Sequence, residues 1–312
     1  METINIVLQV IVPIYMLILV GYLSRKAGLF GKDSLKEMNK GVFRLFLPAL
    51  LFENMYNADL SVDDAGVVIY ALLTVFVIFV ICCLTVPLIE KDRAKAPTII
   101  QGIYRTNFGL LGIALTESCY GKDGTHITVM IVAIVIPVYN ALAVILFEKY
   151  KDRAKVSYKS ILAGVMKNPL ILGTVLGLIV NLSGLRVPEI PNRGISSLGQ
   201  IATPLALIVM GASFEVRHTI ENRKVISAVT FVRLLIIPLL FTMAAVMAGF
   251  RGKELYGLFI MYATPTAVAS YTMAGNMGGD EKLAGEIVFT TTVLSAVTIG
   301  TGVYLLSKAG LI

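Results

Sequence analysis

The sequence predicts an all-α membrane protein with ten transmembrane helices, arranged as two inverted repeats of five helices each. Of its 312 residues, 56% are hydrophobic and only 15% are charged, and the mean hydropathy is +0.81. Such a chain cannot cover a soluble domain with a polar surface, so lipid must be its solvent. Apolar runs recur along the chain, and the chain aligns with itself when shifted by half its length.

Ten apolar segments are long enough to cross the ~30 Å hydrocarbon layer of a bilayer as helices. The first carries no basic region before it and no cleavage pattern after it, so we expect it to be retained as a helix. The connections are short, and no soluble domain is expected. The segments lie near residues 4–23, 41–56, 66–89, 98–119, 125–147, 160–182, 194–214, 225–249, 254–275 and 283–306.

Basic residues gather in alternate loops, which orients the helices by the positive-inside rule. The side that we predict to be cytoplasmic carries 17 of them, namely Arg25, Lys26, Lys32, Lys36, Lys40, Lys91, Arg93, Lys95, Lys149, Lys151, Arg153, Lys155, Lys159, Arg217, Arg223, Lys224 and Lys282. The other side carries six, namely Lys122, Arg186, Arg193, Arg251, Lys253 and Lys308. We therefore expect a multi-pass protein of the cell membrane with both termini outside. The net charge of +7 follows these loops and does not indicate a nucleic-acid partner.

An ungapped shift of 156 positions aligns several helix-breaking residues of the two halves. The aligned pairs are Pro13 with Pro169, Gly21 with Gly177, Gly28 with Gly184, Leu29 with Leu185, and Pro48 with Pro204. We infer two repeats, residues 1–155 and 156–312. Because each contains five helices, the second must enter the membrane from the opposite side, and such inverted repeats are typical of transporters.

The same shift places Gly109 of the fourth helix opposite Pro265 of the ninth. Proline and glycine weaken a helix and expose backbone groups, which is tolerated inside a membrane only where the backbone lines a protein-enclosed cavity. The two breaks therefore predict a cavity between the halves. The alternative is that both residues merely kink their helices, as Pro and Gly often do in membranes.

Two sequence stretches of the broken segments resemble the auxin efflux carrier family, the PIN-like carriers whose bacterial members are often described as organic acid permeases. They are Asn107-Phe108-Gly109-Leu110-Leu111-Gly112-Ile113, and Pro265 with Thr266-Ala267-Val268-Ala269 and the later Gly278-Gly279-Asp280. The chain departs from the family pattern at Ala114, where proline is frequent. The resemblance implies a scaffold of helices 1, 2, 6 and 7, often used for homodimerisation. It further implies a transport unit of helices 3–5 and 8–10, with helices 4 and 9 crossing, and an elevator-type mechanism.

Arg105 lies about seven residues inside the fourth segment and is the leading candidate for contact with an anionic substrate. Its guanidinium matches a carboxylate, whereas the alternative is an arginine that reaches the lipid headgroups. Hydroxyl, amide and backbone groups beside the breaks complete the candidate set, although bonds between helices would explain them equally well. The predicted substrate-binding residues are Arg105, Asn107, Gly109, Thr264, Pro265, Thr266, Ser270 and Tyr271.

Arg233 of the eighth helix is a secondary candidate, with snorkelling or a structural ion pair as its alternatives. Glu53, Glu117 and Glu286 lie toward helix ends; each is expected to be interfacial or hydrogen-bonded, and each could carry a coupling proton. His218 is expected to be a solvated histidine, and so is His126.

The function predicted from the sequence is secondary transport of a small organic anion, such as a malate-like dicarboxylate. Expected partners are this anion, the bilayer and a second copy of the chain, with H⁺ or Na⁺ as candidate coupling ions. A receptor that binds a lipid or metabolite on a transporter-like fold is the alternative. No catalytic residues, cofactor or metal site are predicted, and Cys82, Cys83 and Cys119 are interpreted as small apolar residues.

Overall fold

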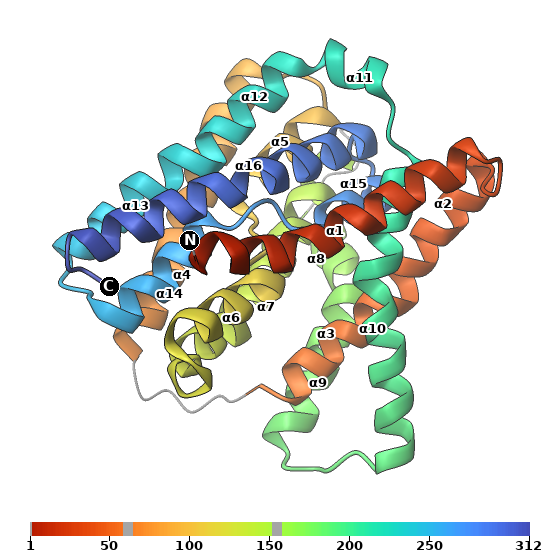
Figure 1. Cartoon of the computed structure of the whole chain (residues 1–312). Helices are drawn as coiled ribbons and strands as arrows, with labels where there is room; N and C mark the ends of the chain where they lie inside the picture. The colour runs from red at the N-terminus through yellow and green to blue at the C-terminus, as the bar shows by residue number, and fades with distance from the viewer. Residues whose placement is uncertain (1, 59–64, 152–157) are drawn as a thin grey trace.

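Every regular element of the chain is helical in the computed structural model, which describes residues 2–58, 65–151 and 158–312 (Figure 1). Five helices in these ranges are long and apolar enough to cross a membrane: α4 (Ala65–Ile89), α7 (His126–Lys151), α10 (Glu189–Ala212), the helix Arg223–Met247 and α16 (Glu281–Lys308). Two shorter apolar helices are α6 (Phe108–Tyr120) and α9 (Pro169–Leu182). The prediction of an all-helical protein with several apolar spans is confirmed.

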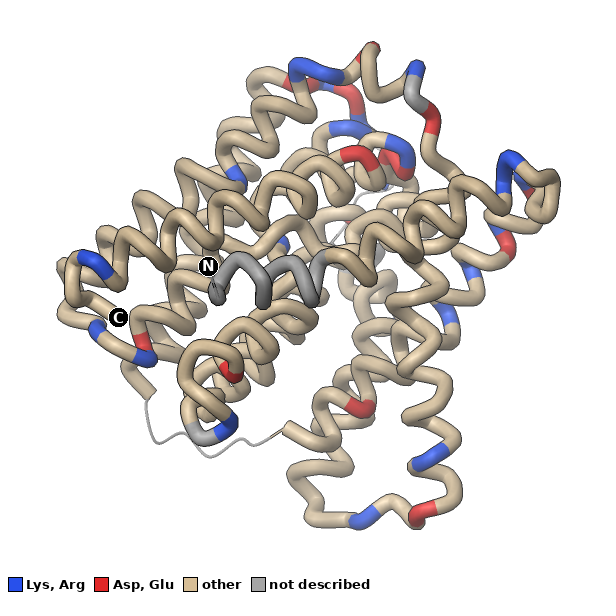
Figure 2. Tube along the Cα trace, in the orientation of Figure 1, with Lys and Arg blue, Asp and Glu red and all other residues tan. Residues whose placement is uncertain are grey.

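The remaining helices complete the ten predicted segments or connect them. They are α1 (Glu2–Lys26), α2 (Lys32–Gly41), η1 (Val42–Phe46), α3 (Leu47–Tyr56), α5 (Lys95–Tyr104), η2 (Lys122–Gly124), α8 (Tyr158–Met166), α11 (Val216–Glu221), α14 (Gly252–Ala263) and α15 (Ala269–Met277). The helix Arg223–Met247 consists of α12 (Arg223–Phe231), η3 (Val232–Ile236) and α13 (Ile237–Met247). Charged residues cluster at helix ends and connections, and long stretches of the helices between them carry none (Figure 2). This distribution is the one that a bilayer requires.

The second apolar segment is longer than predicted, because helix begins at Lys32 and not near residue 41. The additional turns have the sequence KDSLKEMNKG, which is too polar for a search based on hydropathy to detect. The sixth segment is interrupted between α8 and α9. There Asn168 caps α9 by accepting a hydrogen bond from the backbone N–H of Leu170 at 2.9 Å, and Pro169 follows at the first helical position.

Two single π-helical turns precede prolines inside long helices. The turn η1 ends shortly before Pro48, and η3 ends shortly before Pro238. Proline has no N–H and clashes with the carbonyl one turn earlier, and a wider turn relieves that clash while the helix continues. The turn η3 also carries Arg233 into the protein interior.

Glycines allow two pairs of helices to approach closely, α1 with α10 and α9 with α3 (Figure 1). A side chain at Gly21 would overlap the carbonyl oxygen of Ile208, and one at Gly177 would overlap that of Phe52. The two contacts are related by a shift of 156 positions. Gly21 in the first contact corresponds to Gly177 in the second, and Ile208 in the first corresponds to Phe52 in the second. The shift found in the sequence thus relates two packing contacts.

The fourth and ninth segments both break and cross each other at the breaks. Between α5 and α6, and between α14 and α15, the backbone is extended, and Thr106 pairs with Thr266 in an isolated antiparallel bridge. The backbone N–H of Asn107 donates to the carbonyl of Pro265 at 2.7 Å, and that of Ala267 to the carbonyl of Arg105 at 3.2 Å. Each break therefore satisfies part of the other's backbone hydrogen bonding.

The prediction that Gly109 is the counterpart of Pro265 is wrong. Thr106 and Thr266, which are 160 positions apart, occupy matching places in the bridge, so the register at the crossing differs by four positions from that of the glycine contacts. Gly109 lies in the first turn of α6, where a side chain would overlap that of Ile136 in α7. Its role is close packing between helices and not helix breaking.

Candidate functional site

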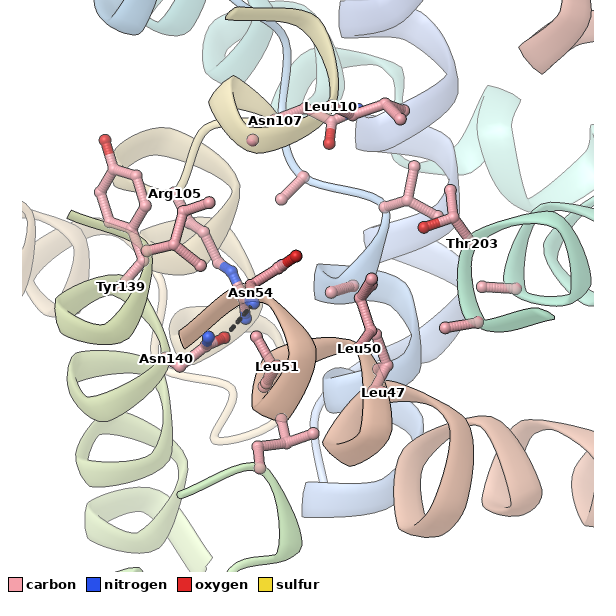
Figure 3. Close-up of a pocket in the computed structure, with 18 of the residues that line it drawn as sticks. Leu47, Leu50, Leu51, Asn54, Arg105, Asn107, Leu110, Tyr139, Asn140 and Thr203 are labelled. Carbon is pink, nitrogen blue, oxygen red and sulfur yellow. Dashed lines mark hydrogen bonds between the residues drawn. The ribbon is translucent and has the colours of Figure 1, made fainter. Parts of the chain in front are cut away.

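A cavity of about 200 Å³ lies beside the crossing, between the broken segments with α7 on one side and α3, α9 and α10 on the other (Figure 3). Most of its wall is apolar, and the polar groups come chiefly from the first break and from α7. The lining residues are Leu47, Leu50, Leu51, Asn54, Arg105, Thr106, Asn107, Gly109, Leu110, Ile136, Tyr139, Asn140, Leu170, Ala202, Thr203, Ala206, Ala267, Val268 and Ala269. One water needs only roughly 10–15 Å³ of such space, so a small organic ion fits.

Arg105 is buried, and its guanidinium projects into this cavity (Figure 3). It follows the last residue of α5 and has extended backbone, which turns its side chain out of the helical path. The guanidinium donates to the sulfur of Met273 and to the side-chain oxygen of Asn140. Both acceptors are neutral, and no described carboxylate forms an ion pair with Arg105. The cavity therefore contains an uncompensated positive charge.

Two buried amide groups add hydrogen-bond donors beside this charge. The Nδ2 atoms of Asn107 and Asn140 are both buried, and neither has a hydrogen-bond acceptor among the described residues. Buried polar groups without partners are rare in folded proteins, because each costs roughly 1–3 kcal/mol. Both residues line the cavity, so a ligand that accepts hydrogen bonds would relieve this cost if the amides turn toward it.

The N-termini of two half-helices also meet at the cavity. Asn107 precedes α6, and Ala267, Val268 and Ala269 lead into α15; all four line the cavity. The first N–H groups of a helix have no intrahelical acceptor and carry a partial positive charge. The arginine, the free amides and the helix termini together favour a bound anion.

The predicted hydroxyl residues of the second break mostly bind other parts of the protein. The Oγ1 of Thr266 donates to the carbonyl of Gly102 at 2.6 Å, and Tyr271 donates to the Oγ of Ser213 at 3.0 Å. The carbonyl of Thr264 accepts from Arg233, and that of Pro265 accepts from Asn107. Ser270 is buried and its Oγ has no described partner. None of these five residues lines the cavity, unlike Arg105, Asn107 and Gly109.

Arg233 binds backbone carbonyls at the crossing; it does not snorkel to a headgroup, and it forms no ion pair with any described residue. It is fully buried and donates to the carbonyls of Ile103, Met261, Tyr262 and Thr264. These carbonyls lie at the C-terminal ends of α5 and α14, which carry partial negative charge. The guanidinium thus caps two half-helices at once.

A second hollow of about 260 Å³ continues from the cavity toward the end of α3. The two hollows share Leu51, Asn54, Gly109 and Ile136, and the second extends to Asn57. Glu53 lines this hollow and is half-buried. Glu117 is exposed and lines neither hollow.

Asn140 is a polar residue of the cavity wall that the sequence interpretation did not identify, and so are Tyr139, Thr106 and Thr203. Figure 3 shows the Arg105 and Asn140 side chains joined by a hydrogen bond, with Asn54 beside them. A signal was present, because Pro137 and Asn140 both interrupt the apolar segment 125–147. A polar side chain at such a depth needs a partner inside the protein.

At the opposite end of the molecule, side chains join α2 and the end of α10 to α15 and α16. The Nδ2 of buried Asn39 donates to Glu281 at 2.6 Å, and Asn276 donates to the carbonyl of Asn39 at 3.3 Å. The Nζ of Lys282 donates to Glu215 at 2.7 Å, which holds the pKa of that carboxyl below its usual value. These contacts join helices at the end of the molecule that we predict to be cytoplasmic.

His218 is not a freely solvated histidine as predicted. Its Nδ1 lies 2.8 Å from the Oε1 of Glu286, which also accepts from Thr219 at 3.0 Å. Glu286 is buried, as α16 packs against α11 at this point. The prediction that Glu286 is hydrogen-bonded is confirmed. The Gly278–Asp280 turn connects two helices: Gly278 adopts φ +83° to end α15, and Asp280 caps α16.

Comparison with known proteins places the chain among membrane transport proteins. The family model described as "Membrane transport protein" matches residues 6–301. The resemblance to the auxin efflux carriers is therefore confirmed over nearly the whole chain.

Several of the similar curated proteins are named as transporters and come from archaea and bacteria. An "Uncharacterized transporter" of Methanothermobacter thermautotrophicus is 23% identical over 93% of this chain and 95% of its own length. The "Uncharacterized transporter YfdV" of Escherichia coli is 23% identical over 85% of this chain and 86% of its own. A "Putative malonate transporter" of Rhizobium meliloti is 23% identical over 96% of this chain and 95% of its own.

Proposed function

The chain belongs to the membrane transport protein family, and we propose that it is a secondary transporter that binds a small carboxylate anion at Arg105. The uncompensated guanidinium of Arg105 carries this proposal, because a buried charge without a carboxylate partner is costly unless a ligand neutralises it. The free amides of Asn107 and Asn140 and the N-termini of α6 and α15 add donors suited to carboxylate oxygens. The family is one of transporters and not of enzymes.

The substrate class that fits best is a small mono- or dicarboxylate. The apolar wall of Leu47, Leu50 and Leu110 would contact a short carbon skeleton, and the cavity volume of about 200 Å³ limits its size. The name of the Rhizobium meliloti relative agrees with this class, so malonate is the first compound to test.

We further propose ten transmembrane helices in two inverted repeats that work as an elevator. The matching contacts of Gly21 with Ile208 and of Gly177 with Phe52 support a repeat in the scaffold, and the Thr106–Thr266 bridge supports one in the transport unit. Scaffold helices α1, α3, α9 and α10 would stay fixed, as their close glycine contacts favour, while the crossed helices move with Arg105. The scaffold would also be the dimer interface.

We propose that the protein lies in the cell membrane with both termini outside. In that orientation, this conformation is an outward-facing state. The cavity continues through Asn54 and Gly109 into the hollow that reaches Asn57. The contacts of Asn39 with Glu281 and of Glu215 with Lys282 close the opposite end. Substrate would therefore enter beside the end of α3.

Uptake into proteoliposomes tests the proposal directly. Purified protein should accumulate labelled malonate or a related carboxylate from a panel, with H⁺ and Na⁺ gradients imposed in turn to identify a coupling ion. Arg105→Gln should weaken substrate affinity about 10- to 100-fold, because a charge-assisted hydrogen bond is worth roughly 1.5–3 kcal/mol. Arg193→Gln, which breaks an exposed ion pair with Glu189, is the matched control and should transport normally.

Two outcomes would contradict the proposal. Normal affinity and flux in Arg105→Gln would remove the anion-binding role of the cavity. Binding of the carboxylate by the wild-type protein without any flux would instead favour a receptor built on a transporter fold. Asn140→Leu tests the same site independently, because it removes one free amide and the oxygen that accepts from Arg105, and should weaken binding while leaving the charge of the site unchanged.

A further inference from the structure

An apolar groove opens on the surface between α1, the end of α10 and α16, away from the candidate site. It has a volume of about 460 Å³. The rings of Tyr15 and Phe289 meet edge to face with centroids 5.7 Å apart, and the rings of Phe214 and Phe289 are 5.4 Å apart. Exposed Val12, Met16 and Leu19 form the side of the groove contributed by α1.

A strongly basic hollow of about 640 Å³ adjoins the groove at the end of α1. Tyr22 and Phe214 line both, so the two spaces are continuous. Six basic side chains line the hollow, namely Arg25, Lys26, Lys32, Lys36, Lys40 and Lys282. Figure 2 shows basic residues at the α1–α2 turn, and Figure 1 shows α1 beside α16.

Most of this positive charge is not neutralised within the described chain. The hollow has two carboxylates, and both already accept a bond: Glu215 from Lys282 and Glu281 from Asn39. Lys40 pairs with Glu37. The four others, Arg25, Lys26, Lys32 and Lys36, have no described carboxylate partner. The hollow therefore carries excess positive charge that an anionic ligand would complement.

We propose that the groove and the basic hollow together form one binding site for an anionic phospholipid. An acyl chain would lie on Met16, Leu19 and Phe289, and the phosphate would lie between Lys26, Lys32 and Lys36. Charge complementarity selects this occupant: the apolar space ends in uncompensated cations at the predicted cytoplasmic face, and anionic headgroups attract basic residues there. A neutral lipid fits the groove but leaves the cations unbalanced.

The position of the site suggests that a bound lipid would affect the movement of the transport unit against the scaffold. Helices α1 and α10 belong to the proposed scaffold and α16 to the proposed transport unit, so a lipid in this crevice would touch both. Binding would therefore respond to the relative position of the two units. This consequence depends on the proposed function, whereas the binding site itself does not.

Fluorescence quenching can test binding without any transport substrate. The chain contains no tryptophan, so Phe214→Trp places a single reporter where groove and hollow meet. In phosphatidylcholine vesicles, brominated phosphatidylglycerol should quench this tryptophan more strongly than the same fraction of brominated phosphatidylcholine. Leu84→Trp, on the exposed face of α4, is the matched reporter and should show no preference.

Charge variants identify the headgroup site in the Phe214→Trp background. Lys26→Gln, Lys32→Gln and Lys36→Gln should each reduce the preference for phosphatidylglycerol about fivefold, and the triple variant should abolish it. The triple change at Lys91, Lys149 and Lys224, which line neither space, should leave it intact. Thermal unfolding of each variant shows whether it is folded.

Three results would overturn the lipid site. One is equal quenching by the two lipids at Phe214→Trp, and another is an equal preference at Leu84→Trp. The third is a loss of the preference when inorganic phosphate is added at constant ionic strength, which would assign the basic hollow to a soluble anion.

Discussion

The backbone N–H of Asn107 donates to the carbonyl of Pro265 at 2.7 Å, where two broken helices cross. This bond connects the two halves of the chain beside the cavity and directs the first turn of α6 toward it. It also explains how extended backbone persists inside an apolar helical protein, because each break supplies hydrogen-bond partners for the other.

Arg105 and Arg233 are expected to differ in their effect on stability. Arg233→Ala leaves the carbonyls of Ile103, Tyr262 and Thr264 without a donor, and should lower the midpoint of thermal unfolding by roughly 5 °C or more. Arg105→Ala removes an uncompensated buried charge and should leave the midpoint unchanged or raise it, while eliminating the shift caused by a bound carboxylate.

Thermal unfolding in detergent, with and without malonate, measures both effects. Arg193→Ala serves as the control for an exposed arginine. An equal loss of stability in Arg105→Ala and Arg233→Ala would contradict the assignment of separate roles.

The glycine contacts of the proposed scaffold predict matched stability losses. Gly21→Ala and Gly177→Ala each place a methyl group on a carbonyl oxygen, of Ile208 and of Phe52, and should each cost roughly 1–3 kcal/mol. Gly194→Ala in α10 meets no atom within 4 Å and should be neutral or stabilising by up to about 1 kcal/mol. Denaturation midpoints of the three variants provide the comparison, and a neutral Gly21→Ala would show that α1 and α10 are less tightly packed.

The bond between Asn39 and Glu281 should favour the state in which the cavity opens toward Asn57. Glu281→Gln removes a charge-assisted bond worth roughly 1.5 kcal/mol or more, which shifts a two-state equilibrium about tenfold. Thr203 lines the cavity, and Thr203→Cys can report this shift in a chain from which Cys82, Cys83 and Cys119 have been removed. The measurement is the rate at which a membrane-impermeant maleimide, added outside, labels the new cysteine.

Labelling should slow in Glu281→Gln and stay unchanged in Glu37→Gln, which breaks only the exposed pair with Lys40. Unchanged or faster labelling in Glu281→Gln would show that this bond does not hold the closed end together.

The carboxylate of Asp92 should make a pH-dependent contribution to stability at the start of α5. The backbone N–H groups of Lys95 and Ala94 donate to its carboxylate at 3.1 and 2.7 Å and hold its pKa below the usual value. A lowered pKa contributes stability above the unfolded pKa of about 4, and this stability is lost as pH falls through the folded pKa. Asp92→Asn keeps an acceptor but loses the negative charge at the helix N-terminus, and should therefore cost roughly 0.3–1 kcal/mol at pH 7.

Unfolding midpoints measured between about pH 6 and 3 should show the difference between wild type and Asp92→Asn shrinking toward acid. Asp33→Asn at the start of α2 is the control for an exposed aspartate. A difference that grows toward acid would contradict the capping role of Asp92.

The sequence was sufficient to predict the apolar helices, because the bilayer requires long uncharged stretches. It was insufficient for α2, whose polar turns have no such signature. Arg105 and Asn107 were found because charged and amide side chains are conspicuous inside an apolar segment. Asn140 was missed because only the fold brings α7 to the first break.

The errors at the second break have a common physical origin. Side chains in extended backbone do not follow helical periodicity, so the directions of Thr264 and Thr266 could not be read from spacing. The offset between corresponding residues of the two halves changes from 156 in the glycine contacts to 160 at the crossing. An ungapped comparison of the halves cannot detect this change. That change displaced the predicted counterpart of Pro265 from Arg105 to Gly109.

The unpaired guanidinium of Arg105 has an electrical consequence. If it moves with the crossed helices as proposed, the empty carrier takes one positive charge across the membrane, a complex with a monovalent carboxylate takes none, and a complex with a divalent one takes a negative charge. Each elementary charge is worth about 2.3 kcal/mol per 100 mV. Membrane voltage would then act on the return of the empty carrier for a monovalent substrate, and on both half-cycles for a divalent one.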